Sequence, residues 1–546
     1  MSDSEDVAGI PVPEGRTELI DTDYEIGQDN IEGQLGPFGF DIHNPVFMVS
    51  GLTIVAFVFY ALALPEQAGA IFGWLRPWLT STFDWFFLGA ANVFVIFCLF
   101  LIVSPWGKVR LGGKDATPDY TYTGWFAMLF AAGMGIGLMF FGVLEPVYHM
   151  AISSPLGTPS PFDADGALIP ENVDRAKEMG LAATIYHWGL HPWAIYAVVA
   201  LALALFSFNK GLPLTIRSAF YPVFGERIWG WTGHVIDILA VFATLFGLAT
   251  SLGFGAQQAN AGLNHIFGVP VSVSVQVILI TAITAVALFS VLRGLDGGVK
   301  LLSEINMGIA ALLLLFVLFA GPTVLILTDF GQGLLAYACE LLPLSNPVGR
   351  TDDSYRAGWT AFYWAWWISW SPFVGMFIAR VSRGRTVREF IICVLLIPSL
   401  VCVLWMAVFG GVAIDQVISD PATSAVKAQV IDSYNPPLSL FAMLDELPLS
   451  QITSVIAIVL VIVFFVTSSD SGSLVIDTIT AGGKVDAPVP QRVFWATFEG
   501  AVAIVLLVGG GLSALQAMVI STGLPFTLVL LLMCWAIFKG LRAEPI

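Results

Sequence analysis

The chain contains twelve long apolar stretches separated by polar segments, and this repetition limits its possible folds more than any other feature. Most stretches reach the roughly 20 residues that an α-helix needs to cross a bilayer, and the longer ones are expected to tilt or break. Only 12% of the residues are charged, whereas soluble domains carry about 25%. The sequence therefore predicts an all-α polytopic membrane protein. Its candidate spans are residues 46–65, 84–104, 124–150, 179–207, 234–263, 270–291, 303–328, 357–380, 387–413, 451–480, 490–512 and 514–539.

The distribution of Lys and Arg predicts the orientation of these spans. If the N-terminus lies inside, 17 of the 23 basic residues fall in inner segments and the other six in outer segments. Cytoplasmic loops of membrane proteins carry such an excess. We therefore expect a multi-pass protein of the cell membrane with both termini in the cytoplasm.

Three polar segments lie outside the spans. Residues 1–45 carry eleven acidic side chains against Arg16 alone and lack the pattern of a signal peptide, so they are expected to form a disordered cytoplasmic tail. Residues 329–345, within the connection 329–356, are too short and mixed to span and predict an amphipathic helix on the outer surface. Residues 540–546 form a short cytoplasmic C-terminus. The formal net charge of −17 argues against nucleic acid as a partner.

The third span is interrupted by closely spaced glycines. The segment Ala131–Gly137 places Gly133, Gly135 and Gly137 at every second position, which weakens a helix and frees backbone carbonyls. Two interpretations are open. The small residues serve close helix packing, or the helix is broken and its exposed backbone binds a substrate or an ion, with these glycines on the path.

The eighth span also contains residues that disturb a helix. Ser369, Ser371 and Pro372 lie near its middle, five spans after the glycine segment. Two five-helix units inserted in succession take opposite orientations, so this spacing predicts an inverted repeat. The repeats would be residues 105–328 and 357–539, with residues 46–104 forming two peripheral helices.

Two clusters of aromatic residues fall at membrane depth. Trp188, Trp193 and Tyr196 fit within one arc of the fourth span, and the eighth span contributes a second group, Trp366, Trp367 and Trp370. A single tryptophan in such a helix usually packs or anchors at the interface. Two clusters at depth instead predict a binding site for a cation without N–H groups, such as trimethylammonium, which ring faces stabilise.

Four segments resemble the betaine/carnitine/choline transporter family in the expected order: GMGIGLMFFGVLEPVYH, HWGLHPWAIY, FYWAWWISWSPFVGMFIARVSRGRTVREF and FFVTSSDSGS. The resemblance implies the leucine-transporter type of 5+5 inverted repeat. By analogy, Trp188, Trp193, Tyr196 and Trp367 match the central cage, and Trp366 and Trp370 match neighbouring aromatics. The resemblance also implies a homotrimer.

The tenth span carries hydroxyl groups within an apolar helix, in the segment Phe464–Asp470. Such hydroxyls commonly bond the carbonyls of their own helix, but oxygen atoms also suit a hard cation. The resemblance implies a sodium site there. Its residues would be Ala131, Met134, Phe464, Thr467 and Ser468, with Thr250 and Ser251 as a second site.

Residue types in the spans bear on the coupling ion. Sodium-independent exchangers of the family carry a fixed positive charge near this site, and no Lys or Arg occurs between Arg227 and Arg293. This favours sodium coupling. Proton coupling stays open because ionisable groups, Glu145 and Asp470 among them, lie in or beside the spans.

The sequence thus predicts a secondary active transporter that imports glycine betaine or a related quaternary-ammonium solute by sodium symport. The alternatives are a proton-coupled choline importer and a sodium-independent carnitine or betaine exchanger. An enzyme is not expected: His187 and His191 are spaced for zinc, but Trp188 replaces the glutamate of an H-E-x-x-H site. No cofactor is expected apart from sodium as coupling ion, and the lipid bilayer and the substrate are the expected partners.

Overall fold

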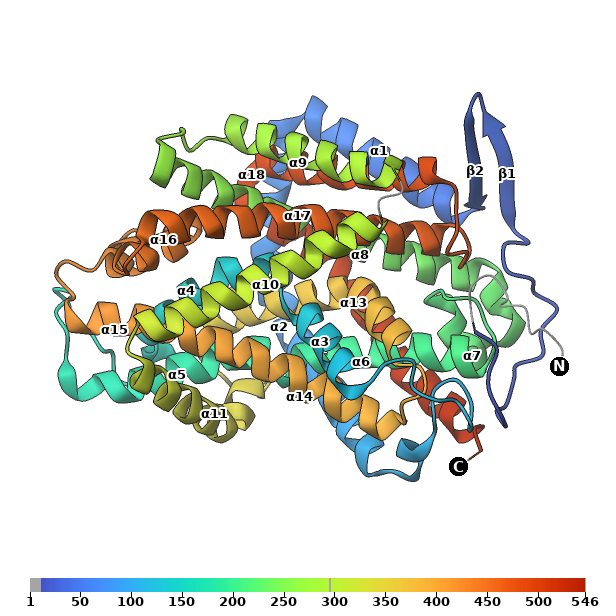
Figure 1. Ribbon diagram of the computed structural model, residues 1–546, viewed down its shortest axis with the longest axis horizontal. Helices are drawn as coiled ribbons and strands as arrows, with labels where there is room; N and C mark the ends of the chain where they lie inside the picture. The colour runs from blue at the N-terminus through green and yellow to red at the C-terminus, as the bar shows by residue number, and fades with distance from the viewer. Residues whose placement is uncertain (1–10, 294–295, 546) are drawn as a thin grey trace.

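A computed structural model describes residues 11–293 and 296–545, which form a bundle of long α-helices with one small β-hairpin (Figure 1). Among the described helices, ten are long and apolar enough to cross a membrane, and eleven when one bent pair is taken as a further span. The predicted all-α polytopic membrane fold is confirmed, with a count slightly below twelve.

The elements follow one another in a simple order. The hairpin consists of β1 (Asn30–Leu35) and β2 (Phe38–His43). The first helices are α1 (Val46–Ala63), α2 (Pro65–Val103), α3 (Tyr122–Gly133), α4 (Ile136–Ala151), α5 (Pro170–Trp188), α6 (Leu190–Ala204), α7 (Tyr221–Phe224), α8 (Trp231–Phe267), α9 (Val273–Arg293) and α10 (Asp296–Ala320). The later helices are α11 (Thr323–Ser345), α12 (Asp353–Tyr355), α13 (Ala361–Val381), α14 (Val387–Trp405), α15 (Gly411–Ser419), α16 (Ser439–Asp445), α17 (Ser450–Thr480) and α18 (Val489–Arg542).

In the part of the chain that the structure describes, two predicted spans are missing from the observed count and one helix that was not predicted to span, α11, is included, so eleven spans stand against twelve. α18 is 54 residues long, but Gly510 and Gly511 inside it have non-helical backbone angles, so two helices meet there at a kink. They match the predicted spans 490–512 and 514–539. α13 matches the predicted span 357–380 but is not among the ten, because its tryptophans, serines and arginine lower its mean hydropathy.

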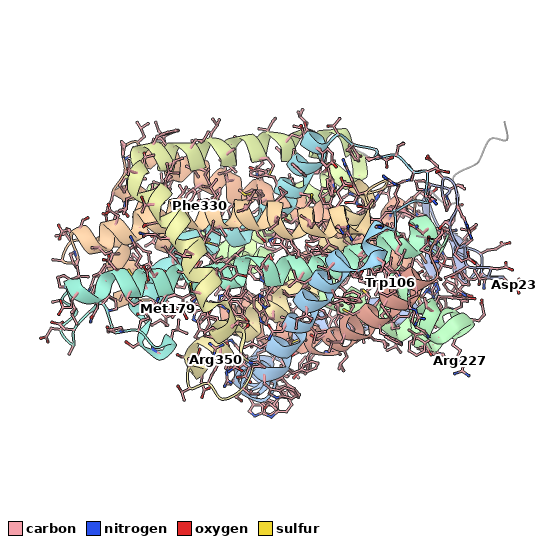
Figure 2. The ribbon with its side chains drawn as sticks, turned by 90° about the horizontal axis from the view of Figure 1, so that it is seen from below. Asp23, Trp106, Met179, Arg227, Phe330 and Arg350 are labelled. Carbon is pink, nitrogen blue, oxygen red and sulfur yellow. The ribbon has the colours of Figure 1, made fainter. Side chains whose placement is uncertain are left out.

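The predicted surface helix is longer than expected, and the end of the preceding span was placed too late. α10 ends at Ala320, and α11 begins at Thr323 directly after Pro322, which cannot donate the backbone hydrogen bond that would continue a helix. α11 has 23 residues and is itself long and apolar enough to span. Figure 2 shows α11, which carries Phe330, crossing the helix of Met179 obliquely.

The two predicted helix interruptions have different outcomes. The third span is broken, since α3 and α4 meet at 65°, but the predicted irregularity of the eighth span is wrong, because α13 continues through Pro372. Pro372 cannot donate to the carbonyl of Ile368, and the Ser371 hydroxyl donates to that oxygen instead, at 2.6 Å. The serine hydroxyl thus satisfies the carbonyl that the proline leaves without a donor, and the helix continues. Without a second break, the inverted repeat stays a prediction.

The predicted disorder of the N-terminal tail is wrong for residues 11–45, while residues 1–10 lie outside the described part. The backbone N–H of Glu14 donates to the carbonyl of Gly112 at 2.8 Å, and Arg383 donates to the Glu14 carboxylate at 2.6 Å. Acidic side chains of this segment pair with basic side chains of the loops at the end of the bundle. The sequence placed both signs of charge on one side of the membrane, and their pairing orders the segment.

Tyr24 fixes the middle of this segment. Its ring stacks on Trp229 with centroids 4.0 Å apart, and the fully buried Arg217 donates to its hydroxyl at 2.8 Å. Burial raises the pKa of Tyr24 to about 12, so the hydroxyl stays protonated. Arg217 also pairs with the buried Asp237, with 3.3 Å between Nε and Oδ2.

We predict that Arg217→Met lowers the thermal unfolding midpoint of the purified protein strongly. The substitution leaves Asp237 buried without its cation, which costs about 3–5 kcal/mol. The double variant Arg217→Met/Asp237→Leu removes both charges and should recover much of the loss. Arg227→Met, at an exposed position on the same surface, serves as control. A double variant as unstable as the single one would show that the loss does not come from an unpaired Asp237 carboxylate.

Candidate functional site

The broken third span forms the floor of the candidate site. Met134 and Gly135 lie between α3 and α4 in extended conformations. Gly137 lies in the first turn of α4, and a Cβ atom there would approach the Trp188 ring to 2.9 Å and the Trp366 ring to 3.1 Å. The glycine therefore allows two indoles to lie directly on the helix backbone, and a larger residue would push them away.

The predicted aromatic residues come together from three helices. Trp188 ends α5, Trp193 and Tyr196 lie on α6, and Trp367 lies on α13. The Trp367 ring lies 4.9 Å from Trp188 and 6.2 Å from Tyr196, edge to face in both pairs. Trp193 meets Tyr196 at 5.1 Å in the same geometry. Edge-to-face packing is a favoured arrangement of aromatic rings.

These rings line a cavity, called here the aromatic cavity. It is lined by all six predicted aromatic residues, Trp188, Trp193, Tyr196, Trp366, Trp367 and Trp370, and by Gly133, Gly135 and Gly137. The other lining residues are Ala132, Met134, Ile136, Leu138, Pro192, Ser251, Val374 and Cys402. None of these lining residues is charged. A charged guest can therefore interact with aromatic ring faces and backbone groups, but not with a side chain of opposite charge.

Trp366 and Trp370 lie at one side of the aromatic cavity. The Trp366 ring stacks on Trp367 at 4.7 Å, and its Nε1 donates to the Ser251 hydroxyl at 3.2 Å. Trp370 donates from Nε1 to the carbonyl of Gly247 at 3.0 Å. Both indoles are thus held against α8, and each keeps one surface on the cavity.

A second cavity of about 720 Å³ adjoins the first and is called here the hydroxyl cavity. Its wall includes all five residues of the predicted first sodium site, Ala131, Met134, Phe464, Thr467 and Ser468. Thr467 donates to the carbonyls of Val463 or Phe464 at 3.0 and 3.3 Å, which leaves its oxygen lone pairs available as ligands.

The predicted second sodium pair is divided. Ser251 lines the aromatic cavity, whereas the Thr250 hydroxyl donates to the carbonyl of Phe246 at 2.8 Å or of Leu515 at 3.1 Å, between α8 and α18. Neighbouring residues of a helix point about 100° apart, so the structure does not bring these two hydroxyls to one cavity.

The cavities continue toward the end of the bundle that carries the N-terminal segment. A third space of about 1240 Å³, the basic cavity, shares Phe373, Phe377 and Ser471 with the hydroxyl cavity and includes Arg380 and Arg383. On the opposite side, Phe141 packs against Trp366 at 5.9 Å and separates the aromatic cavity from a space of about 940 Å³ near α16. Rings therefore lie between the aromatic cavity and the space on one side, whereas successive cavities share lining residues on the other side.

Residues 45–546 match the model of the betaine/carnitine/choline family transporters. The chain belongs to this family. It is 61% identical to a glycine betaine/proline/choline transporter of Vibrio parahaemolyticus over 98% of this chain and 97% of the relative. A glycine betaine transporter of the same organism is 56% identical over 96% and 97% of the two chains. A third relative there, a glycine betaine/proline/choline/ectoine transporter, is 53% identical over 96% and 91%.

Membership confirms the predicted resemblance and makes the protein a transporter rather than an enzyme. Each of the three relatives is matched over nearly its whole length, and the family model extends from residue 45 to residue 546. The location in the cell membrane, the cytoplasmic termini and the homotrimer stay predictions.

A buried carboxylate forms hydrogen bonds that position tryptophans of the cage in this transporter. Glu145 on α4 accepts hydrogen bonds from Trp188 Nε1 at 2.7 Å and from the Tyr363 hydroxyl at 2.6 Å. His187 and His149 bond its other oxygen, and the backbone carbonyl of His187 accepts from Trp367 Nε1 at 2.9 Å. One acidic group thereby orients two cage tryptophans.

Sequence reasoning missed this arrangement. Tyr363 and His149 carry no signal in the sequence, because their role depends on where α4, α5 and α13 meet. Within the described part of the chain, Glu145, His149 and His187 form the single group of three side chains spaced for a metal ion, with ligand atoms within 4.8 Å. In this structure those atoms bond one another and the cage. His191 lies apart, bonded to Asn92 at 2.9 Å.

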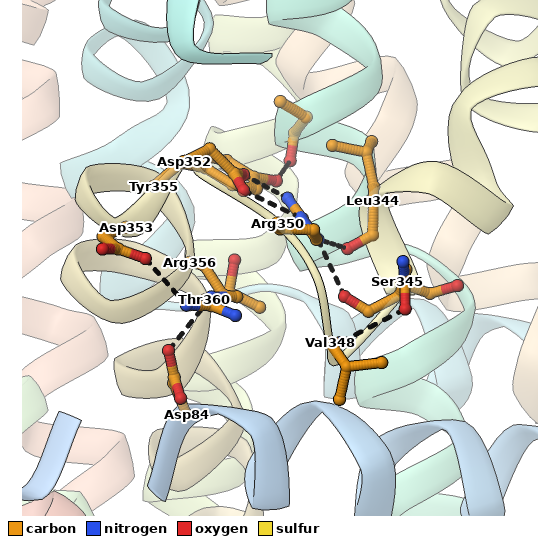
Figure 3. A network of polar contacts seen from close by, with 12 residues as sticks. Asp84, Leu344, Ser345, Val348, Arg350, Asp352, Asp353, Tyr355, Arg356 and Thr360 are labelled. Carbon is orange, nitrogen blue, oxygen red and sulfur yellow. Dashed lines mark hydrogen bonds and ion pairs between the residues drawn. The ribbon is translucent and has the colours of Figure 1, made fainter. Parts of the chain in front are cut away.

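A polar network fixes the start of α13, which carries three of the six aromatic residues that line the aromatic cavity (Figure 3). Arg356 pairs with Asp84 of α2 at 3.0 Å, and Arg350 donates to Asp352 at 2.9 Å. The Thr360 hydroxyl bonds His187 at 2.9 Å and joins this network to the carboxylate behind the cage. The connection before α13 is therefore tied to α2 and α5.

We predict that Glu145→Gln disturbs the cage without removing a ring. Trp188 and Tyr363 both donate to Oε2, whereas His187 and His149 bond Oε1. The neutral amide must place its nitrogen on one of these two sides, and it loses the charge-assisted hydrogen bonds of the carboxylate, which are roughly twice as strong as neutral ones. The unfolding midpoint should fall, and the near-ultraviolet circular dichroism of the tryptophans should change. Glu178→Gln, at a partly exposed position on α5, is the control. Equal spectra for the two variants would show that the carboxylate does not orient the indoles.

Proposed function

We propose that this transporter imports glycine betaine or a closely related quaternary-ammonium solute in symport with sodium. The single observation that carries the proposal is the aromatic cavity at the broken helix, whose wall is made of rings and contains no charged side chain. The names of the relatives, which include glycine betaine and choline, support the substrate class.

The chemistry of the cavity suits a methylated cation. A trimethylammonium group has no N–H to donate and a diffuse charge, so it gains little from a carboxylate partner. Ring faces stabilise it by about 0.5–2 kcal/mol per contact, and Trp188, Trp193, Tyr196 and Trp367 supply four rings. Binding of this strength stays reversible, as transport requires.

The opposite end of a betaine molecule is a carboxylate, and the break between α3 and α4 suits it. The first N–H groups of α4, beginning at Ile136, have no acceptor within the helix and carry the positive end of its dipole. Ile136 and Gly137 line the aromatic cavity. A zwitterion can thus place its cation among the rings and its anion at the start of α4.

The hydroxyl cavity supports sodium as the coupling ion. Sodium is a hard cation that takes oxygen ligands, and the hydroxyls of Thr467 and Ser468 lie in one wall with the backbone of Ala131 and Met134. The same broken helix therefore borders both cavities. An ion held there would fix the backbone that forms the floor of the substrate site, and this offers a physical basis for coupling.

Uptake into proteoliposomes tests the proposal most directly. Labelled glycine betaine, choline and carnitine are each supplied with an inward gradient of sodium, of protons, or of neither. Accumulation of betaine only with sodium is expected. Choline uptake driven by protons alone, or ion-independent exchange of carnitine, would overturn the coupling claim, and failure of all three substrates would overturn the substrate class.

We predict that Trp367→Ala raises the KM for betaine about tenfold, because one ring contact and the orientation of Trp188 are lost. Trp367→Phe keeps a ring face and should lose less. Trp74→Ala is the control, since Trp74 is 61% exposed and far from the cage in sequence. An unchanged KM for Trp367→Ala would contradict a role of this ring in binding.

We also predict that Thr467→Ala raises the sodium concentration needed for half-maximal uptake, while the maximal rate at saturating sodium changes less. Thr497→Ala is a matched control, because Thr497 likewise donates to the carbonyl four residues earlier, Val493, at 2.7 Å but lies exposed on α18. If both variants shift the sodium dependence equally, the hydroxyl cavity does not hold the ion.

A further inference from the structure

The β-hairpin that precedes α1 has one polar and one apolar face. Directly opposed residues of an antiparallel pair share a face, and the register pairs Ile31 with Ile42, Gly33 with Phe40 and Leu35 with Phe38. The apolar face therefore consists of Ile31, Leu35, Phe38, Phe40 and Ile42. The opposite face carries Asn30, Glu32, Gln34, Asp41 and His43.

The polar face is fixed to the protein. Lys484, in the turn between α17 and α18, donates to Glu32 at 3.1 Å and to Asp41 at 2.5 Å. Asn30 donates to the carbonyl of Ala481 in the same turn at 2.9 Å. Burial lowers the pKa of His43 to about 3, so this side chain adds no positive charge.

The apolar face, in contrast, is largely uncovered. Leu35 is 76% exposed, Phe38 57% and Ile31 43%. The Phe40 ring lies across Gly33, where a Cβ atom would approach it to 2.5 Å, and so broadens the same face. A two-stranded hairpin is marginally stable by itself in water, and a contiguous apolar patch of this kind marks an interaction surface.

The position of the hairpin identifies what covers this face. Only Asn44 and Pro45 separate β2 from α1, which is one of the candidate membrane spans. A groove of about 630 Å³ separates the apolar face from Phe47 on α1 and Phe494 on α18. Figure 1 shows the hairpin beside the end of α1, at the end of the bundle that carries the N-terminal segment.

The far wall of the groove continues into the lipid-facing surface. Phe47 and Phe494 pack together at 5.3 Å, and the next residues along α1 include Met48, Val49 and Leu52, which are 39%, 36% and 63% exposed. Apolar side chains exposed on a spanning helix face acyl chains. The groove therefore opens toward the acyl chains that surround α1, near the end where this helix leaves the hydrocarbon core.

We infer that the apolar face of the hairpin is a membrane-interface anchor, seated at the boundary between headgroups and acyl chains, with lipid filling the groove. This places a β-hairpin in the role usually taken by amphipathic helices, whose apolar faces lie at that depth. Glu32 and Asp41 make the polar face acidic, so attraction to anionic lipid does not contribute. The hairpin fixes the ordered N-terminal segment against the bilayer, and this inference does not depend on the substrate.

Site-directed spin labelling of the full chain in nanodiscs of zwitterionic phospholipid tests the inference. Single nitroxides are placed at Leu35→Cys and Phe38→Cys, with Gln34→Cys on the opposite face as control, in a background without the five native cysteines that retains uptake. We expect positions 35 and 38 to collide more with lipid-soluble oxygen and several-fold less with an aqueous nickel complex than position 34. Added anionic lipid should not strengthen this difference.

Positions 35 and 38 as accessible to nickel as position 34 would overturn the inference. So would shielding that disappears when each nanodisc holds one chain, because a second copy would then cover the face. A photoreactive diazirine residue in place of Phe38 gives an independent measurement with the native cysteines present. Adducts with phospholipid are expected, and adducts with protein alone would contradict a lipid-covered face.

Discussion

The close approach of two indole rings to the backbone of α4 is the contact on which the candidate site depends. Trp188 and Trp366 reach the first turn of this helix because Gly137 has no side chain. The same break that exposes the backbone also lets rings from α5 and α13 close over it. The helix break, the aromatic cavity and the hydroxyl cavity therefore all border one short glycine segment.

Buried polar groups organise this region without entering the cavity. Glu145 lies behind the rings and accepts hydrogen bonds from Trp188 and Tyr363, while the wall that faces the cavity remains uncharged. In this position the carboxylate fixes the orientation of Trp188 and Tyr363 without adding a charge to the cavity wall.

Much of the candidate site could be predicted from the sequence, because two aromatic clusters and a glycine-interrupted span fall together at membrane depth. The six aromatic residues and three glycines meet at one cavity, and the five candidate sodium residues meet at the next. Contacts between distant segments could not be predicted. The carboxylate network joins α4, α5 and α13, and Thr250 lies away from Ser251 because of helix geometry. The predicted irregularity at Pro372 was wrong because the hydroxyl of the preceding serine donates to the carbonyl to which the proline cannot donate.

The N-terminal segment shows a similar limit. Its acidic composition indicated disorder, yet Arg383, Arg217 and Lys484 lie far along the chain and give it partners. Composition alone does not reveal charge pairs between residues that lie so far apart in the sequence. The amphipathic hairpin could have been found from the alternation of apolar residues in β2, which has the period of a strand.

The central claim is that ring faces bind a positive charge, and a neutral isostere isolates this charge. Affinities for glycine betaine and for 3,3-dimethylbutanoate, which replaces the quaternary nitrogen with carbon, can be compared by calorimetry in sodium. The two molecules share shape and carboxylate, so the account predicts binding of the isostere at least about tenfold weaker, from three or four lost cation–π contacts. Equal affinities would contradict the account, because the cavity would then recognise only an apolar shape.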